Sequence, residues 1–84
     1  MKVRVRYFAS IREALGRADD ALDLPAGASV AQARDLLMAR DALHAEVLSR
    51  SRAVRVALDQ AVCDESAVLH DGGELAFFPP VTGG

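Results

Sequence analysis

Residues 2–8, KVRVRYF, alternate strictly between charged and apolar or aromatic side chains up to the last position. Because successive side chains of a strand point to opposite faces of a sheet, this pattern predicts a strand that is buried on one face only. Odd-numbered residues would face the core and even-numbered ones the outside. A half-buried strand at the start of the chain therefore commits the fold to a sheet that is covered on one side.

Four further segments have the features of strands: residues 20–24, 53–58, 61–63 and 74–78. Turn sequences separate them, namely Pro25-Ala26-Gly27, Asp59-Gln60 and Asp71-Gly72-Gly73. In 53–58 we expect Val54, Val56 and Leu58 to point inward. The last strand should stop at Pro79-Pro80, because proline has no N–H to donate to a sheet.

Two segments have helix-start signals. Ser10 followed by Glu13 has the spacing of a capping box, which predicts a short helix over about residues 11–15 that Gly16 ends. Ser29 with Gln32 predicts a longer helix from Val30 to about Arg40. The apolar face of the longer helix would carry Val30, Ala33, Leu36, Leu37 and Met38. Residues 41–52 fit either a further helix or a loop that covers the core.

These elements predict an α+β fold, a mixed sheet of four to five strands with one main helix packed across it. With 84 residues the chain has room for one domain, which we place at residues 1–80, followed by a tail at 81–84. So small a domain has little space for a deep active site, which favours a carrier or binding module over a self-contained enzyme.

Charge and cysteine content indicate which kinds of partner and which cellular compartment to expect. A net charge of −2 provides no overall basic field for nucleic acid. The N-terminal segment resembles neither a signal peptide nor a membrane span. A single cysteine, Cys63, fits a reducing compartment, so we expect a cytoplasmic location.

Strand parity singles out two aromatic residues. Phe8 falls with the charged residues of the first strand, and in 74–78 an inward Leu75 and Phe77 leave Phe78 pointing outward. If the first and last strands are parallel neighbours, Phe8 and Phe78 lie side by side on the outer face. Twisting of the strand ends into the core is the alternative. Because aromatic residues commonly anchor interfaces, we expect a surface that binds a partner.

The sequence finishes with Val81, Thr82, Gly83 and Gly84. Glycine lacks a side chain and can pass through a narrow channel, and the preceding prolines favour an extended chain. The distinctive group of such a tail would be the α-carboxylate of Gly84, which is a poor electrophile while it is ionised. It would first have to be activated, for which we expect an acyl-adenylate made by another protein, and could then be captured by sulfur or by an amine.

The FFPPVTGG ending after DGGEL, together with the opening VRYFASIREALG, resembles the small subunit of molybdopterin synthase, a MoaD-type, ubiquitin-like sulfur carrier. The resemblance implies a β-grasp fold with adjacent, parallel first and last strands. It also implies that an E1-like, MoeB-type enzyme adenylates Gly84 with ATP. Gly84 would then be carried as a thiocarboxylate (1-thioglycine), with sulfur from a separate donor, while the chain itself binds no cofactor.

In this family the tail enters a pocket of the MoaE-type large subunit, and sulfur passes to cyclic pyranopterin monophosphate in molybdenum cofactor biosynthesis. The resemblance implies a heterotetramer in which this chain is a non-catalytic subunit. It assigns sulfur carriage to Gly84 and threading to Gly83, with Thr82 and Val81 behind it. The apolar contact positions are Phe8, Val62 and Phe78. The family often has Asn where this chain has Asp59; the turn should survive, but a contact through the amide N–H₂ would be lost.

Other functions stay open. The chain could carry sulfur for thiazole synthesis or tRNA thiolation, act as a ubiquitin-like protein modifier, or be an interaction domain with an incidental diglycine. We expect no metal site, because His44, His70 and Cys63 lack ligand spacing. Cys63 should be buried and unreactive. Asp19, Asp20, Asp64 and Glu65 should be solvated loop charges. Three arginines could hold an acidic partner or phosphate, although a solvated edge is the simpler interpretation: Arg50, Arg52 and Arg55.

Overall fold

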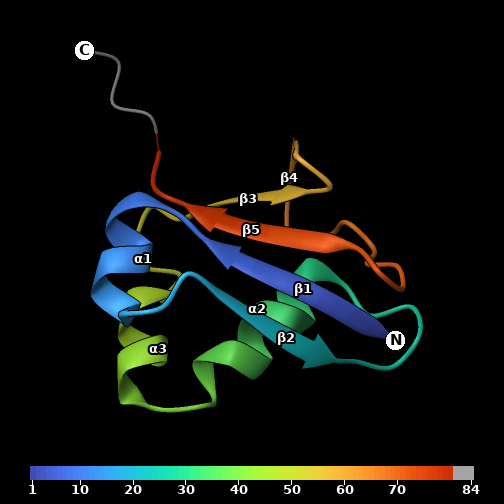
Figure 1. The fold of residues 1–84 in the computed structure, drawn as a ribbon, viewed down its shortest axis with the longest axis horizontal. Coiled ribbons are helices and arrows are strands. Elements are labelled where there is room, and N and C mark those ends of the chain that lie inside the picture. The colour runs from blue at the N-terminus through green and yellow to red at the C-terminus, as the bar shows by residue number, and fades with distance from the viewer. Residues whose placement is uncertain (81–84) are drawn as a thin grey trace.

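A computed structural model of the chain describes residues 1–80 (Figure 1). Its elements are β1 (Lys2–Tyr7), α1 (Ala9–Leu15), β2 (Asp19–Asp23), α2 (Val30–Met38), α3 (Ala42–Val47), β3 (Arg55–Leu58), β4 (Ala61–Cys63) and β5 (Glu74–Phe78). The expected α+β class and mixed sheet are confirmed, and α3 settles the ambiguous stretch after α2. The predictions for Val81, Thr82, Gly83 and Gly84, including a domain boundary after residue 80, lie outside the described residues.

The five strands lie in the order β2-β1-β5-β3-β4. β1 and β5, from opposite ends of the sequence, are parallel neighbours at the centre, with Val5 opposite Leu75 and Tyr7 opposite Phe77. The other pairs are antiparallel. The helices belong to one side of this sheet, and α2 runs behind β1 and β2 in Figure 1. No helix of residues 1–80 covers the opposite side of the sheet.

The core lies between the sheet and the helices. The alternation of KVRVRYF appears in β1 as strictly alternating exposed and buried side chains, as expected from the sequence. Burying these apolar faces against the helices is the main favourable contribution to folding. The fully buried large residues are Tyr7, Phe77, Leu37, Leu48, Leu75, Val3, Val5 and Val30.

Both hydrogen bonds of the capping box expected at the start of α2 are present. Ser29 Oγ accepts from the backbone N–H of Gln32 at 3.3 Å, and Gln32 Oε1 accepts from the N–H of Ser29 at 2.8 Å. The expected buried face is correct for Val30, Ala33 and Leu37 but wrong for Leu36, which is 47% exposed. Arg34 is buried in its place, because its guanidinium finds acceptors beside the helix.

The capping box expected at Ser10 is absent. α1 begins two residues earlier than expected, at Ala9, with Phe8 as the N-cap and no side-chain cap. Ser10 therefore lies inside the helix, where its hydroxyl cannot serve the first turn. β1 passes into α1 through Ala9, whose φ of 50° lies in the left-handed region. The expected stop at Gly16 is confirmed by a left-handed C-cap with φ 70°.

The expected turn after β3 is confirmed and has left-handed φ values at Asp59 (50°) and Gln60 (69°), as a tight hairpin requires. Asp59 also binds a neighbouring turn: its Oδ1 accepts from the N–H of Glu74 at 3.0 Å, and its Oδ2 contacts His70 Nε2. Within residues 1–80, no helix has the length and apolar character needed to cross a lipid bilayer.

Candidate functional site: the outer face of the sheet

The face of the sheet that the helices leave open contains the residues singled out by strand parity. Phe8 is 39% exposed and Phe78 is half-buried, whereas Leu75 and Phe77 are fully buried. The predicted outward direction of the two phenylalanines is therefore confirmed, and the alternative that both are core residues is wrong. Their role in binding a partner remains a prediction.

Phe8 and Phe78 are neighbours because β1 and β5 are parallel and stop at the same edge. The N–H of Phe8 donates to the carbonyl oxygen of Phe77 at 3.1 Å, which extends the parallel ladder by one residue. The Arg6 guanidinium carbon lies 5.2 Å from the ring centroid of Phe8, in cation–π range. Arg6 also forms an ion pair of 3.7 Å with Glu74, which holds it against the ring.

Val62 lies on the same face, on β4, which is two strands away from β5. It is 63% exposed on β4 and lies opposite Ala57 on β3, which in turn lies opposite Ala76 on β5. The two alanines are buried although they face outward. An apolar surface, here called the outer-face patch, thus crosses four strands and consists of Phe8, Ala57, Val62, Ala76 and Phe78.

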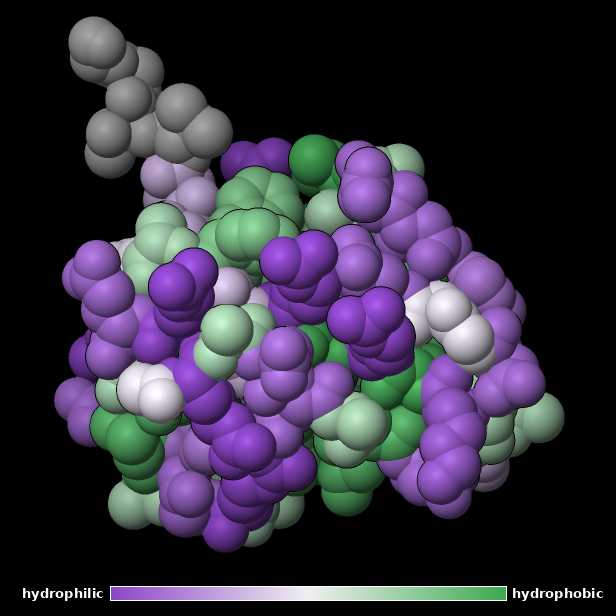
Figure 2. All heavy atoms as spheres, viewed as in Figure 1, coloured by the Kyte–Doolittle hydropathy of each residue, from purple (hydrophilic) through white to green (hydrophobic). Residues whose placement is uncertain are grey.

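Figure 2 shows hydrophobic atoms gathered where β1 and β5 end, with hydrophilic atoms around them. A continuous apolar area with a polar border is the usual anatomy of a protein-binding surface. The outer-face patch has this anatomy.

A polar cluster behind the sheet holds the end of β1 in place. Tyr7 stacks on Phe77 with ring centroids 6.2 Å apart, and its hydroxyl donates to Asp20 Oδ2 at 2.9 Å. Asp20 also pairs with Arg40 at 2.7 Å and Arg17 at 2.8 Å. Burial, with the Asp20 carboxylate second, raises the pKa of Tyr7 above its usual range. The expectation that Asp20 is a solvated loop charge was wrong, because three partners compensate its burial.

β5 leaves the sheet beside a cleft of about 270 Å³. Pro79 forms one wall of it, α1 contributes Ile11, α3 contributes Val47, and the segment before β3 contributes Val54. The chain therefore leaves the sheet between this cleft and the outer-face patch.

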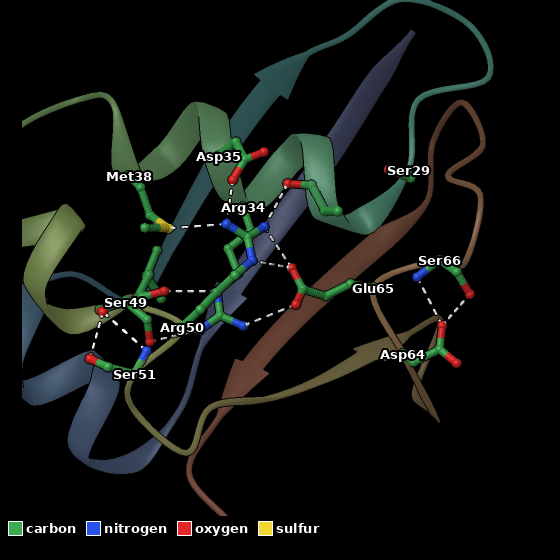
Figure 3. A network of polar contacts seen from close by, with 12 residues as sticks. Ser29, Arg34, Asp35, Met38, Ser49, Arg50, Ser51, Asp64, Glu65 and Ser66 are labelled. Atoms are coloured by element: carbon green, nitrogen blue, oxygen red, sulfur yellow. Dashed lines mark hydrogen bonds and ion pairs between the residues drawn. The ribbon is translucent and has the colours of Figure 1, made fainter.

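The three arginines that the sequence grouped together have different surroundings in the structure. Figure 3 shows the first of them, Arg50, among its partners. Arg50 binds Glu65 at 2.7 Å and Asp35 at 2.5 Å, and also donates to the carbonyl oxygen of Ala31. These partners leave Arg50 tied to its own chain. Glu65 was also expected to be a solvated charge, but it binds Arg50 and lies 3.7 Å from the guanidinium of the buried Arg34. It therefore links the two arginines.

Arg34 fastens the segment that leads toward β3. Its Nε donates to the carbonyl oxygen of Leu48 at 2.7 Å and its Nη2 to that of Ser49 at 2.9 Å. Arg52 forms an exposed ion pair with Glu46 at 3.2 Å. Arg55, the third arginine of the group, lies on the outer face at the start of β3, opposite Phe78.

Comparison with known proteins places this fold and surface in a family. The ThiS family matches residues 5–84. The chain belongs to the ThiS family. Curated relatives include the molybdopterin synthase sulfur carrier subunit of Mycobacterium tuberculosis, 32% identical over all of this chain and 99% of that protein. The corresponding subunit of Escherichia coli is 33% identical over 98% of this chain and 99% of its own length.

Solved structures have the same fold as this ThiS-family chain. Small archaeal modifier protein 1 from Haloferax volcanii aligns over all of both chains with a TM-score of 0.81 and 26% identity. Subunits 1 and 2 of the molybdopterin-converting factor of Helicobacter pylori were solved as a complex, one chain of which aligns in full with a TM-score of 0.70 and 24% identity. The ubiquitin-like β-grasp prediction is confirmed.

The histidines and the cysteine of this ThiS-family chain form no metal site within residues 1–80. His44 is buried with its Nδ1 2.8 Å from Asp41 Oδ1, and His70 lies in the turn held by Asp59. Cys63 is half-buried on β4, where burial raises the pKa of its thiol and so lowers the fraction of reactive thiolate.

Sequence reasoning missed the residues that support the site rather than those that form it. Arg6 on Phe8, Asp20 under Tyr7 and the buried Arg34 all depend on partners distant in sequence. Strand parity placed Arg6 and Phe8 on the same face, so the same reasoning could have predicted their contact. Nothing local marks Arg34 as buried, because arginine is rarely an interior residue.

Proposed function

We propose that this protein is the sulfur-carrier subunit of a molybdopterin synthase. The observation that carries the proposal is its similarity, along its whole length, to molybdopterin synthase sulfur carrier subunits of two bacteria. The outer-face patch and the exit of β5 beside it support the proposal, since a carrier needs a docking surface near its reactive end.

Gly84 is the residue that would react. In the proposed cycle an E1-like enzyme binds ATP, and a carboxylate oxygen of Gly84 attacks the α-phosphorus, releasing pyrophosphate. Sulfur from a donor then attacks the acyl carbon and AMP leaves, which gives the thiocarboxylate. Activation is needed because an ionised carboxylate resists nucleophilic attack. The sulfur then bonds to a carbon of cyclic pyranopterin monophosphate, and water cleaves the bond between this sulfur and the acyl carbon, which returns Gly84 to a carboxylate.

The large synthase subunit is the proposed partner of the outer-face patch. Its precedent is the Helicobacter pylori protein of the same fold, which was solved in complex with subunit 2 of the converting factor. We propose that Phe8, Val62 and Phe78 dock on this partner while Thr82, Gly83 and Gly84 enter its active site. The catalytic groups would then belong to the large subunit, and this chain would donate sulfur without being an enzyme itself.

A second function is favoured by one observation, the likeness to small archaeal modifier protein 1 with a TM-score of 0.81. A modifier would use the same activated Gly84 but transfer it to an amine. The two functions therefore differ in the acceptor and not in the fold.

Intact-mass measurement separates these functions. The purified protein is incubated with ATP, the E1-like enzyme of the same organism and a sulfide source. Replacement of one oxygen by one sulfur at Gly84 supports a sulfur carrier. Covalent ladders on other proteins support a modifier, and an unchanged mass contradicts both. A variant lacking Gly84 is the control, because it should gain no sulfur while keeping its fold.

A further inference from the structure

Arg55 is the first residue of β3 and is exposed. Its strand partner across the sheet is Phe78, so the two side chains share the outer face. Val56, the next residue, is buried on the opposite face. Arg55 therefore lies at the border of the outer-face patch, on the side away from Arg6.

Three arginines close to Arg55 in sequence or on the outer face have their charges compensated within the protein. Arg6 pairs with Glu74 at 3.7 Å and Arg52 with Glu46 at 3.2 Å, and Arg50 binds two carboxylates. For Arg55, no Asp or Glu oxygen of residues 1–80 lies within the 4.0 Å of an ion pair. A cation without a carboxylate partner in the described part of the chain thus borders an exposed aromatic surface.

We propose that Arg55 determines partner choice by pairing with a carboxylate of the large synthase subunit, next to the pocket that receives Phe78. This inference rests on the proposed function and adds the chemistry of its partner. Arginine beside an aromatic residue is the composition of interface hot spots. Because this protein has a net charge of −2, an acidic partner would otherwise be repelled, and a local cation at the docking surface orients the encounter.

Other occupants fit this surface less well. A second copy of this chain would bring two Arg55 cations to the same interface, where like charges oppose association. Nucleic acid binding would need a cluster of basic residues, whereas Arg50 and Arg52 are engaged by carboxylates of the protein itself. Arg4 lies apart from Arg55, opposite Glu74 at the other end of β5. An acidic protein surface with an apolar pocket is the complement that these residues specify.

The test is the rate of association with the purified large subunit of the same organism, measured at several salt concentrations. Arg55→Glu is compared with Arg12→Glu, which changes the net charge equally. Arg12 is exposed on α1, in the helix layer, and likewise has no carboxylate of residues 1–80 within ion-pair distance. We expect Arg55→Glu to associate on the order of tenfold more slowly at low salt, with the difference shrinking as salt screens the charges.

The outcomes separate the inference from the proposed function. Wild-type binding with equal rates for Arg55→Glu and Arg12→Glu would overturn the role of Arg55 and leave the sulfur-carrier function intact. No wild-type binding at all would contradict the proposed function and the choice of partner with it. Equal melting temperatures of the two variants establish that a slower rate reflects the lost charge contact and not unfolding. Restored association of Arg55→Glu with a large subunit whose facing carboxylate is changed to lysine would identify the pair.

Discussion

The N–H of Phe8 donates to the carbonyl oxygen of Phe77 at 3.1 Å, although 69 residues separate them in sequence. This bond continues the parallel pairing of β1 and β5 to the point where both strands end. As a result the first and last strands together hold Phe8 and Phe78 beside the exit of the chain. The same strand pair thereby places the outer-face patch and the end of β5 side by side.

Phe78→Ala should weaken binding to the large synthase subunit while the domain stays folded. Phe78 is half-buried at the end of β5, and a central interface aromatic commonly contributes about 2 kcal/mol, or roughly 30-fold in affinity. Calorimetric titration measures the affinity, and circular dichroism checks the fold. Unchanged affinity would remove the outer-face patch from the interface.

Val62 and Val68 provide a matched comparison that tests whether the outer-face patch binds the large subunit. The two side chains are exposed to 63% and 61%, but Val62 lies on the outer face, whereas Val68 pairs with Ser29 near the start of α2. Val62→Ala should reduce affinity for the large subunit by severalfold, and Val68→Ala should leave it unchanged. If the two variants behave alike in the titration, location on the outer face does not decide binding.

Ser29→Ala should destabilise the protein by about 1 kcal/mol, the usual contribution of a side-chain N-cap. Ser10→Ala should cost much less, because Ser10 lies inside α1 and caps nothing. Urea unfolding of both variants measures the difference in the free energy of unfolding. Equal losses would contradict the assignment of the two helix starts.

Tyr7→Phe should lower the free energy of unfolding by about 1 kcal/mol, since it removes one partly buried hydrogen bond. Asp20→Ala should cost more, because it leaves the Tyr7 hydroxyl, Arg17 and Arg40 without their shared acceptor. A double-mutant cycle tests the contact itself. Strict additivity of the two substitutions would show that the hydroxyl and the carboxylate are not coupled.

The contact between His70 and Asp59 predicts a pH dependence of stability. The Asp59 carboxylate, followed by the carbonyl oxygen of Asp71, raises the pKa of His70 above its ordinary value of 6.5. A raised pKa stabilises the fold below that ordinary value, and the stabilisation is lost as the pH rises through the pKa of the folded state. We expect wild type to lose stability relative to His70→Gln above about pH 6.5, in urea unfolding at a series of pH values. A constant difference between the two proteins across this range would contradict the contact.

Sequence reasoning was reliable where neighbours in sequence decide the structure. The alternation of residues 2–8 and the capping box of Ser29 with Gln32 depend on local geometry, and the structure has both. The capping box at Ser10 failed because β1 turns directly into α1 at Ala9, and no local signal marked that conformation.

Polar residues were the other source of error. Asp20 was expected in solvent and Leu36 in the core, but Asp20 is almost buried by Tyr7 and two arginines, while Leu36 is exposed. A buried charge depends on partners that only the folded chain brings together, so its position could not be read from the sequence alone. The outward direction of Phe8 and Phe78 was predictable because strand parity fixes direction without such partners.

The most direct measurement starts from protein carrying sulfur at Gly84. It is mixed with the large subunit and cyclic pyranopterin monophosphate, and the mass of the chain and the formation of molybdopterin are followed together. We predict that Gly84 returns to the carboxylate mass as molybdopterin appears. Retention of the thiocarboxylate in that mixture, with no molybdopterin formed, would contradict the proposed function.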